Sequence, residues 1–364
     1  MFRSVPICEV PDEVHDFQII RRDMLVTTSS FVGGRYTHRI GRFSADEGRY
    51  RWASEVGSIG PSFSSCFLLG DVGTVFLCAQ LKQFDMRSGS VLLDLGCDDT
   101  IWGPSIRERE TVIFSTGTGS MYSFSLSKGV LRQLGRTLSN FRSATLLGQS
   151  LVVLIAGHTK RRYLPFLTKS AARIDALNLR TNELWTVRDL DGEGSFVTVS
   201  SNDGILLLAK SNEVSRVTMS GEAIWSTLVG GGPRQYVSVS FHGPWGGGVL
   251  VSAGRWLALL DMETGRVLWE YEVDEIADVI PLRNNAILFS TCGGGFLSMG
   301  DPENYVALLD PCAGRIKHRV ILHDTVRANL RSFDNRIIAY AIRRRVTRGE
   351  VRYVTGFQEI RPTT

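Results

Sequence analysis

A turn motif recurs seven times along the chain, and this repetition constrains the fold more than any other feature. In each copy an apolar run leads into a short polar residue, and a residue suited to a tight turn, usually Gly, follows. The polar side chain can bond the turn backbone, and Gly can take a positive φ. The copies, each with its last residue, are FSADEGRYRW (Trp52), FDMRSGSVLL (Leu93), FSLSKGVLRQ (Gln133), LNLRTNELW (Trp185), VTMSGEAIW (Trp225), LDMETGRVLW (Trp269) and LDPCAGRIKH (His318).

The spacing of the copies predicts the fold class. The turn residues at 48, 89, 129, 182, 221, 265 and 314 are separated by about 40 to 53 residues, which is the length of a four-stranded propeller blade. Short apolar runs such as TVFLCAQ and GVLVSAG precede each turn, and we expect them to be buried inner strands that approach one another near the propeller axis. The pattern predicts an all-β protein made of four-stranded antiparallel blades.

The two ends of the chain predict how the array closes. An eighth apolar run, RIIAYAIRRR, follows the last motif, and the strand VRYVTGFQEI comes after it without an outer strand of its own. A strand at about residues 4–10 likewise has no blade. Pairing it with the strands of about 325–360 would complete an eighth blade and remove exposed sheet edges. We therefore predict a single eight-bladed propeller domain over residues 1–364, with seven blades as the alternative.

Four copies of the motif carry a tryptophan near the start of the strand after the turn. A large apolar ring there can lie across the neighbouring blade and stabilise the packing between sheets. We expect this structural docking role, rather than cofactor binding, for Trp52, Trp185, Trp225 and Trp269.

Residues 249–269, VLVSAGRWLALLDMETGRVLW, resemble the repeat of pyrroloquinoline-quinone-type propellers. Quinoprotein alcohol dehydrogenases and the non-enzymatic propeller of the outer-membrane assembly machine share this repeat. The resemblance implies the fold but not a function, because the motif serves the fold in both kinds of member. The chain also lacks the vicinal Cys-Cys pair of the dehydrogenases.

The sequence offers no catalytic, cofactor-binding or metal-binding constellation. The six histidines have no metal-ligand spacing, and the Gly-rich segments lack the Lys-Ser/Thr of a phosphate loop. We therefore predict no enzyme activity, no cofactor and no small-molecule substrate. No signal peptide or membrane-spanning run is evident, and the cysteines are scattered as in a reducing compartment, so we expect a cytoplasmic protein without membrane contact.

Four blades have a long connection between their second and third strands, at 31–38, 158–170, 293–305 and 343–352. We interpret these segments as loops on one face of the propeller, where partner recognition is common. Three of them are basic. The predicted partner-binding residues are Arg35, Lys160, Arg161, Arg162, Tyr163, Phe166, Arg343, Arg344 and Arg345.

These loops favour a non-catalytic scaffold or a subunit of a multi-protein assembly. Their Arg and Lys residues predict a protein partner with an acidic surface. Nucleic acid is a less favoured partner, because the net charge is only +4 and no aromatic stacking platform is evident. The alternatives are a quinone- or metal-dependent oxidoreductase or sensor with a site in the central funnel, and a nucleic-acid-associated scaffold.

Overall fold

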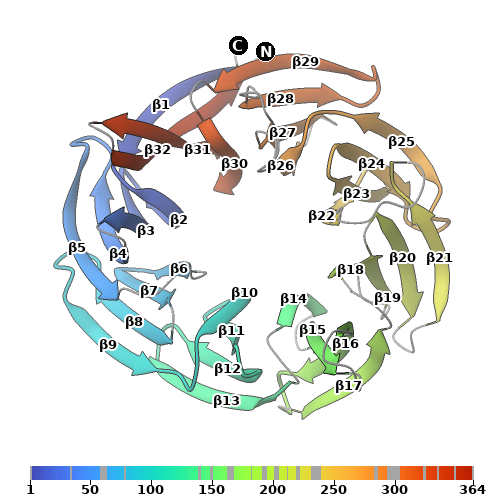
Figure 1. The fold of residues 1–364 in the computed structure, drawn as a ribbon, viewed down its shortest axis with the longest axis horizontal. Helices are drawn as coiled ribbons and strands as arrows, with labels where there is room; N and C mark the ends of the chain where they lie inside the picture. Colours follow the sequence, from blue (N-terminus) through green and yellow to red (C-terminus); the bar gives the residue numbers. More distant parts are fainter. Residues whose placement is uncertain are drawn as a thin grey trace. The chain divides into compact units, whose positions relative to one another are not determined.

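The protein is all-β in the part of the chain that the computed structural model describes. The described residues are 2–32, 35–57, 64–77, 79–137, 141–147, 151–161, 168–181, 183–190, 195–200, 205–210, 212–218, 222–230, 239–282, 286–292, 304–322, 325–333, 336–347 and 350–362. They form eight four-stranded antiparallel sheets (Figure 1). The predicted fold class is confirmed.

The chain divides into two compact units, of which the first comprises Met1–Val75, Phe84–Leu92 and Tyr271–Thr364. Three sheets lie in this unit. One is β1 (Phe2–Val10), β32 (Glu350–Pro362), β31 (Arg336–Thr347) and β30 (Thr325–Phe333), in that spatial order. The others are β2 (Glu13–Ile20), β3 (Asp23–Val32), β4 (Arg35–Ser44) and β5 (Arg49–Gly57), and β26 (Ile276–Pro281), β27 (Ile287–Thr291), β28 (Asn304–Asp310) and β29 (Arg315–Leu322).

The second unit comprises Phe76–Gln83 and Leu93–Glu270. Two of its sheets are β10 (Ile101–Glu108), β11 (Thr111–Thr116), β12 (Ser120–Ser125) and β13 (Val130–Arg136), and β14 (Phe141–Leu147), β15 (Leu151–Arg161), β16 (Thr168–Asn178) and β17 (Glu183–Leu190). The next two are β18 (Ser195–Ser200), β19 (Ile205–Lys210), β20 (Glu213–Thr218) and β21 (Ala223–Leu228), and β22 (Val239–Trp245), β23 (Gly248–Ala253), β24 (Trp256–Asp261) and β25 (Val267–Glu272). The sheet of β6 (Ser64–Leu69), β7 (Val72–Leu77), β8 (Gln80–Asp85) and β9 (Val91–Gly96) has residues in both units, and the last two residues of β25 belong to the first unit.

The N-terminal strand pairs with the last strand of the chain, as predicted from the unpaired strands at the two chain ends. β1 runs antiparallel to β32, with Val5 opposite Glu359 and Val10 opposite Thr355. Each of the other sheets is a simple meander of consecutive strands. One closed eight-bladed ring over residues 1–364 stays a prediction.

The apolar runs are buried strands, as predicted. All described residues of β23 and β27 are buried, and each strand lies second in its sheet. The sequence pattern did not single out the first strands. These first strands gave a weak sequence signal because their ladders are irregular: the pairing of β2 shifts between Val14 and Asp16, and that of β26 between Ile276 and Asp278.

The aspartate after each of these two shifts links its sheet to the next one. The Oδ2 atom of Asp16 accepts the backbone N–H of Cys66 on β6 at 2.7 Å. Asp278 Oδ2 accepts the backbone N–H of Leu330 on β30 at 3.0 Å in the same way. The bulge turns a carboxylate towards the neighbouring first strand, where it satisfies a backbone donor that would otherwise lack a sheet partner.

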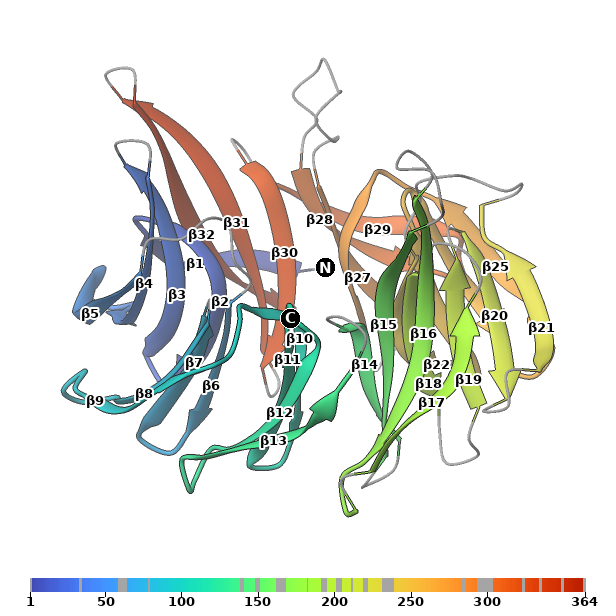
Figure 2. The same ribbon diagram turned by 60° about the horizontal axis from the view of Figure 1, so that its bottom comes forward.

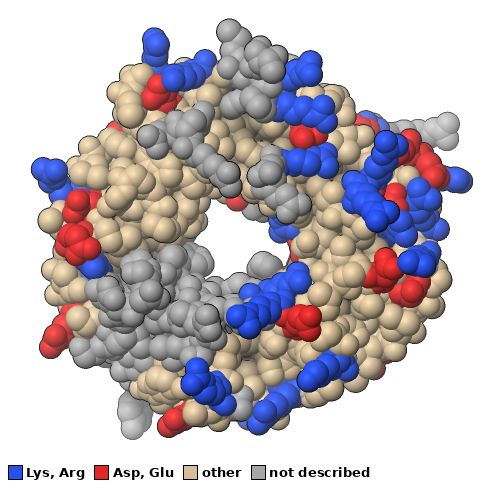
Figure 3. Space-filling model, turned by 180° about the vertical axis from the view of Figure 1, so that it is seen from behind, with Lys and Arg blue, Asp and Glu red and all other residues tan. Residues whose placement is uncertain are grey.

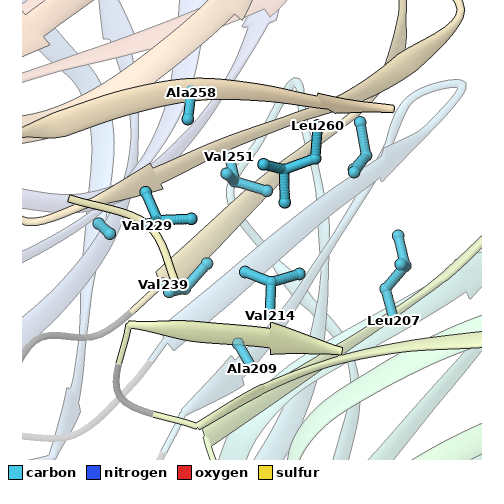
Figure 4. Packing of buried hydrophobic residues seen from close by; sticks show 10 residues of the cluster. Leu207, Ala209, Val214, Val229, Val239, Val251, Ala258 and Leu260 are labelled. Atoms are coloured by element: carbon cyan, nitrogen blue, oxygen red, sulfur yellow. The ribbon is translucent and has the colours of Figure 1, made fainter. Parts of the chain in front are cut away.

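Aliphatic side chains fill the space between neighbouring sheets. In the second unit, Leu207 and Val214 of one sheet face Val251 and Leu260 of the next, with Ala258 completing the layer (Figure 4). All five are essentially inaccessible to solvent. Burial of this kind contributes roughly 25 cal/mol per Å² of apolar surface, which makes sheet-on-sheet packing the main stabilising term.

Aromatic rings fill the corresponding space between β2 and the sheet of β1 and β30–β32. The ring of Phe17 on β2 lies 4.9 Å from that of Phe357 and 5.1 Å from those of Phe333 and Tyr340, measured between centroids. Phe17 is fully buried. The sheet that is completed by the N-terminal strand therefore packs on its neighbour through an aromatic cluster.

The repeated motif forms the turn between the third and fourth strands of each sheet. Asp261 Oδ1 accepts the backbone N–H groups of Glu263 and Thr264 at 3.1 and 2.8 Å, and Gly265 takes φ = 71°. Gly48, Gly89, Gly129 and Gly314 also have positive φ. The predicted turn chemistry is confirmed at these copies.

Two of the predicted tryptophans lie on the turn of the following sheet. The indole N–H of Trp52 donates to the carbonyl of Met86 at 3.1 Å, and that of Trp225 donates to the carbonyl of Met262 at 3.0 Å. A Cβ atom added to Gly265 would lie only 2.5 Å from the Trp225 ring. The glycine thus permits close approach of the ring as well as the turn conformation.

The other two tryptophans differ from this pattern. Trp269 packs edge-on against Trp245 of its own sheet, and Tyr271, two residues further on, donates its hydroxyl hydrogen to the carbonyl of Pro311 at 2.7 Å. Sequence reasoning missed Tyr271. Trp185 is 38% exposed, and the turn it would meet, residues 219–221, lies outside the described residues. The stabilising role of all four tryptophans stays a prediction.

Candidate protein-binding surface

The long connections are between second and third strands, as expected, but two of them are not loops. β3 and β4 continue to Val32 and Arg35, and β31 and β32 continue to Thr347 and Glu350. Only residues 33–34 and 348–349 separate the paired strands. The prediction of loops was wrong here because alternating β-branched, aromatic and long basic side chains continue the ladder almost to the tip.

These two extended hairpins lie in the same unit and exceed the ordinary sheets in length. β31 and β32 contain 12 and 13 residues and β3 and β4 contain 10 each, whereas β7, β8, β11 and β12 contain six. Figure 2 shows both hairpins extending at the same end of the unit. We call them the long hairpins. A paired ladder is a stiffer support for a binding surface than a loop would be.

The long hairpin of β31 and β32 carries a concentrated positive charge. Arg345 lies directly opposite Arg352 in the register, next to Arg344 opposite Tyr353. Like charges opposite each other destabilise a sheet by roughly 0.2–1 kcal/mol. The side chain of Arg345 is 55% exposed and Tyr353 is also exposed, so this charge and an aromatic ring are available to an anionic partner.

A single carboxylate on the N-terminal strand holds two of the predicted arginines. Glu9 on β1 accepts a hydrogen bond from Arg343 at 3.0 Å and another from Arg345 at 2.9 Å. Arg343 is therefore partly a structural residue that fastens β1 to its sheet. Sequence reasoning missed Glu9, and only the predicted pairing of β1 with β32 could have pointed to it.

The other predicted binding residues are only partly described. Arg35 begins β4 and Lys160 and Arg161 end β15, and only the backbone is described at these three positions and at Arg344. Arg162, Tyr163 and Phe166 lie outside the described residues, as does most of the segment 293–305. β15 and β16, with 11 residues each, form a third long hairpin in the second unit.

Two histidines lie near the same end of the β2–β5 sheet. The rings of His15 and His38 are 6.2 Å apart, and His15 Nε2 lies 2.7 Å from Ser29 Oγ. Burial lowers the pKa of His15 to about 4, and the nearby His38 adds to the effect. His15 is therefore neutral at physiological pH.

The described residues show no group of three or more His, Cys, Asp and Glu side chains placed to hold a metal ion. Within the same ranges, no helix is long and apolar enough to cross a bilayer.

These sheets, with their turn motif and inter-sheet docking, define a β-propeller of the pyrroloquinoline-quinone-like repeat class. The sequence profile of the family described as outer membrane protein assembly factor BamB matches residues 170–359, just over half of the chain, and the chain belongs to this family. No curated protein sequence matches it.

Solved structures show the same fold at low sequence identity. The computationally designed protein Ika8 is 12% identical with a TM-score of 0.63, and the alignment covers 96% of this chain and 99% of Ika8. BamB from Moraxella catarrhalis is 15% identical with a TM-score of 0.59, covering 98% and 97%. Sqt1 from Saccharomyces cerevisiae is 12% identical with a TM-score of 0.60, covering 98% and 99%.

Proposed function

We propose that this protein is a non-catalytic scaffold that binds an acidic protein surface through its long hairpins. The main observation behind this proposal is that Arg345 and Arg352 lie opposite each other near the exposed end of the β31–β32 hairpin. Glu9 pairs with Arg345 in the free protein, and two guanidinium groups side by side at an exposed end attract an anionic partner. The family description, an assembly factor, supports a role among protein partners.

The remaining predicted residues would extend this surface. Arg35 begins the second strand of the neighbouring long hairpin, in register with Val32. Lys160, Arg161, Arg162, Tyr163 and Phe166 would contribute a second contact from the hairpin of β15 and β16. We also propose that the scaffold is one propeller domain acting in the cytoplasm.

To test this proposal, the proteins captured by the purified wild type are compared with those captured by a variant that lacks the hairpin charges. Arg344→Gln/Arg345→Gln removes two charges at the exposed end; it breaks the hydrogen bond of Arg345 to Glu9 and leaves that of Arg343 in place. We expect this variant to lose proteins that the wild type captures, with at most a small fall in melting temperature, because an exposed ion pair contributes little to stability. Captured partners should also dissociate as salt is raised, because exposed charge pairs are screened.

Arg49→Gln/Arg87→Gln is the matched control. It removes two exposed arginines, one at the start of β5 and one in the β8–β9 turn, at the opposite end of their sheets. We expect this variant to capture the wild-type set. If the hairpin variant does so as well, the binding surface is elsewhere on the protein.

A further inference from the structure

A cavity of about 280 Å³ lies in the first unit, at the end of the sheets opposite the long hairpins. Its walls come from β1, β31 and β32 on one side, and from the β2–β3 turn and the β4–β5 turn on the other. This volume is at the small end of ligand-binding pockets and suits one or two amino-acid residues rather than a large cofactor.

The floor of the cavity is apolar. Ile7 of β1, Ile19 of β2 and Ile338 of β31 line it, together with the buried side chain of Met24. The pairing of β1 with β32 shifts between Pro6 and Cys8, so the ladder skips Ile7. An aliphatic side chain of a ligand would lose its water contacts on this floor, which is favourable.

The rim carries more positive charge than its own carboxylates can balance. Four arginines and three acidic side chains line the cavity, but Asp23 is already bound outside it, by Arg42 and Arg51. Asp23 therefore neutralises none of the rim. In the space-filling view from behind, Lys and Arg side chains gather at upper right, over the strands β1–β5 and β30–β32 of the first unit (Figure 3).

Two of the rim arginines are held in place by one carboxylate. Glu359 binds Arg336 through both oxygens, at 3.0 and 3.1 Å, and Arg361 at 2.6 Å. These hydrogen bonds, first that of Arg336, lower the pKa of Glu359, so the carboxylate stays charged. The pair of guanidinium groups is thus fixed at the cavity wall and shares a single negative charge.

Arg21 is the most informative residue of the rim. It lies in the two-residue β2–β3 turn with φ = 57°, a conformation that costs a non-glycine residue energy and that Gly70 takes in the β6–β7 turn. In the described part of the chain, no carboxylate pairs with Arg21. A strained position thus presents an uncompensated guanidinium to the cavity, and strain of this kind is concentrated at functional sites.

We propose that this cavity binds the carboxyl end of a peptide chain whose last side chain is aliphatic. The terminal carboxylate accepts hydrogen bonds from Arg21 and from the guanidinium groups at the wall, and the last side chain lies on the floor formed by Ile7, Ile19, Met24 and Ile338. An acidic side chain within a peptide would not place an aliphatic group beside its carboxylate in so small a space. This site is independent of the proposed scaffold surface, because it uses other residues at the opposite end of the sheets.

Fluorescence anisotropy with labelled pentapeptides tests the proposal on the full chain. The probe is Ser-Gly-Ser-Leu-Leu with a free carboxylate, compared with the same peptide as its carboxamide and with Ser-Gly-Ser-Leu-Ser. We expect saturable binding of the first, and binding about tenfold or more weaker for each of the others, the usual effect of losing one charged hydrogen bond or one buried aliphatic side chain. Equal binding of the carboxamide would overturn the proposal.

Arg21→Gly separates binding from folding. It removes the guanidinium and puts glycine at a positive φ, so we expect about tenfold weaker binding of the free-carboxylate peptide with no loss of thermal stability. Arg109→Gly is the matched control, because Arg109 has φ = 53° in the β10–β11 turn and does not line the cavity. Unchanged affinity in Arg21→Gly, or equal loss in both variants, would contradict the assignment.

Octanoate tests whether the cavity binds a fatty acid instead of a peptide. It carries a carboxylate on an aliphatic chain but no peptide group. We expect it to displace the labelled peptide at least tenfold less effectively than the unlabelled peptide does. If octanoate competes more strongly than the peptide, the cavity is a fatty-acid site and the peptide assignment is wrong.

Discussion

The two ends of each sheet follow different rules. At the third-to-fourth-strand turns, Asp85, Asp261 and Asp310 each accept hydrogen bonds from the backbone two and three residues further on. At the second-to-third-strand end, the paired strands range from six residues each in β7 and β8 to 12 and 13 residues in β31 and β32. One end is uniform and the other varies from sheet to sheet.

This difference distinguishes the turns, which stabilise the packing between sheets, from the hairpins, whose length can vary. A uniform turn is required wherever a tryptophan of the preceding sheet packs on it, as Trp52 packs on Gly89 and Trp225 on Gly265. Towards the opposite end, the inter-sheet contacts of Asp16 and Asp278 come from first strands, so the second-to-third-strand hairpins can lengthen without disturbing them. We therefore expect stability to be most sensitive at the turns, and partner binding at the long hairpins.

The largest expected effect comes from Gly265→Ala. The new methyl group would clash with the Trp225 ring at 2.5 Å, and alanine would have to take φ = 71°. Strain and displacement of the ring together should lower the free energy of unfolding by about 2–5 kcal/mol. Urea unfolding of both proteins measures this difference.

Gly246→Ala serves as its control. Gly246 has φ = 57°, but no atom lies within 4 Å of the added Cβ. Only the backbone strain remains, and the loss should be about 1 kcal/mol. If the two variants lose equal stability, the contact with Trp225 contributes nothing and the docking role is wrong.

As pH falls, the two ends of the sheets should lose their contributions to folding stability in separate pH ranges. The pKa of His15 falls from 6.5 to about 4 on folding, so the unfolded chain binds the proton first and stability declines as pH falls from about 6.5 to 4. The expected loss is on the order of 1–3 kcal/mol. His15→Gln should remove this part of the pH dependence in thermal melts; an unchanged profile would show that His15 does not cause it.

The turns should respond only at lower pH. Hydrogen bonds within the turn, first that of the Thr264 hydroxyl, lower the pKa of Asp261 below its usual 3.8, and the backbone N–H of Ser88 does the same for Asp85. Their stabilising contribution is present above about pH 4 and is lost as pH falls below it. Asp261→Asn should reduce this second decline and leave the first one intact.

The smallest expected effect is at the long hairpin. Arg352→Glu would place a carboxylate opposite Arg345, which already pairs with Glu9, so stability should change by less than about 1 kcal/mol. Partner capture should fall at the same time. A variant that keeps its partners would mean that the arginine pair does not serve binding.

Much of the fold could be predicted because its signals are local. The Asp-x-x-Thr-Gly turn needs only the short side chain of Asp261 and the freedom of Gly265, both of which are visible in a few residues. The candidate binding surface could be predicted less well from the sequence. Arg343 was expected to bind a partner, but Glu9, more than 300 residues away in the chain, holds it against β1.

The sequence by itself determined the repeat length, the turn conformation and the pairing of the two chain ends, because each depends on neighbouring residues or on counting strands. Only the tertiary structure decided that Tyr271 contacts the turn after Trp269, that the long connections of β3–β4 and β31–β32 are paired strands, and that Arg21 and Ile7 share a cavity. These features depend on side chains from distant segments meeting in space, and no local pattern encodes which of them will meet.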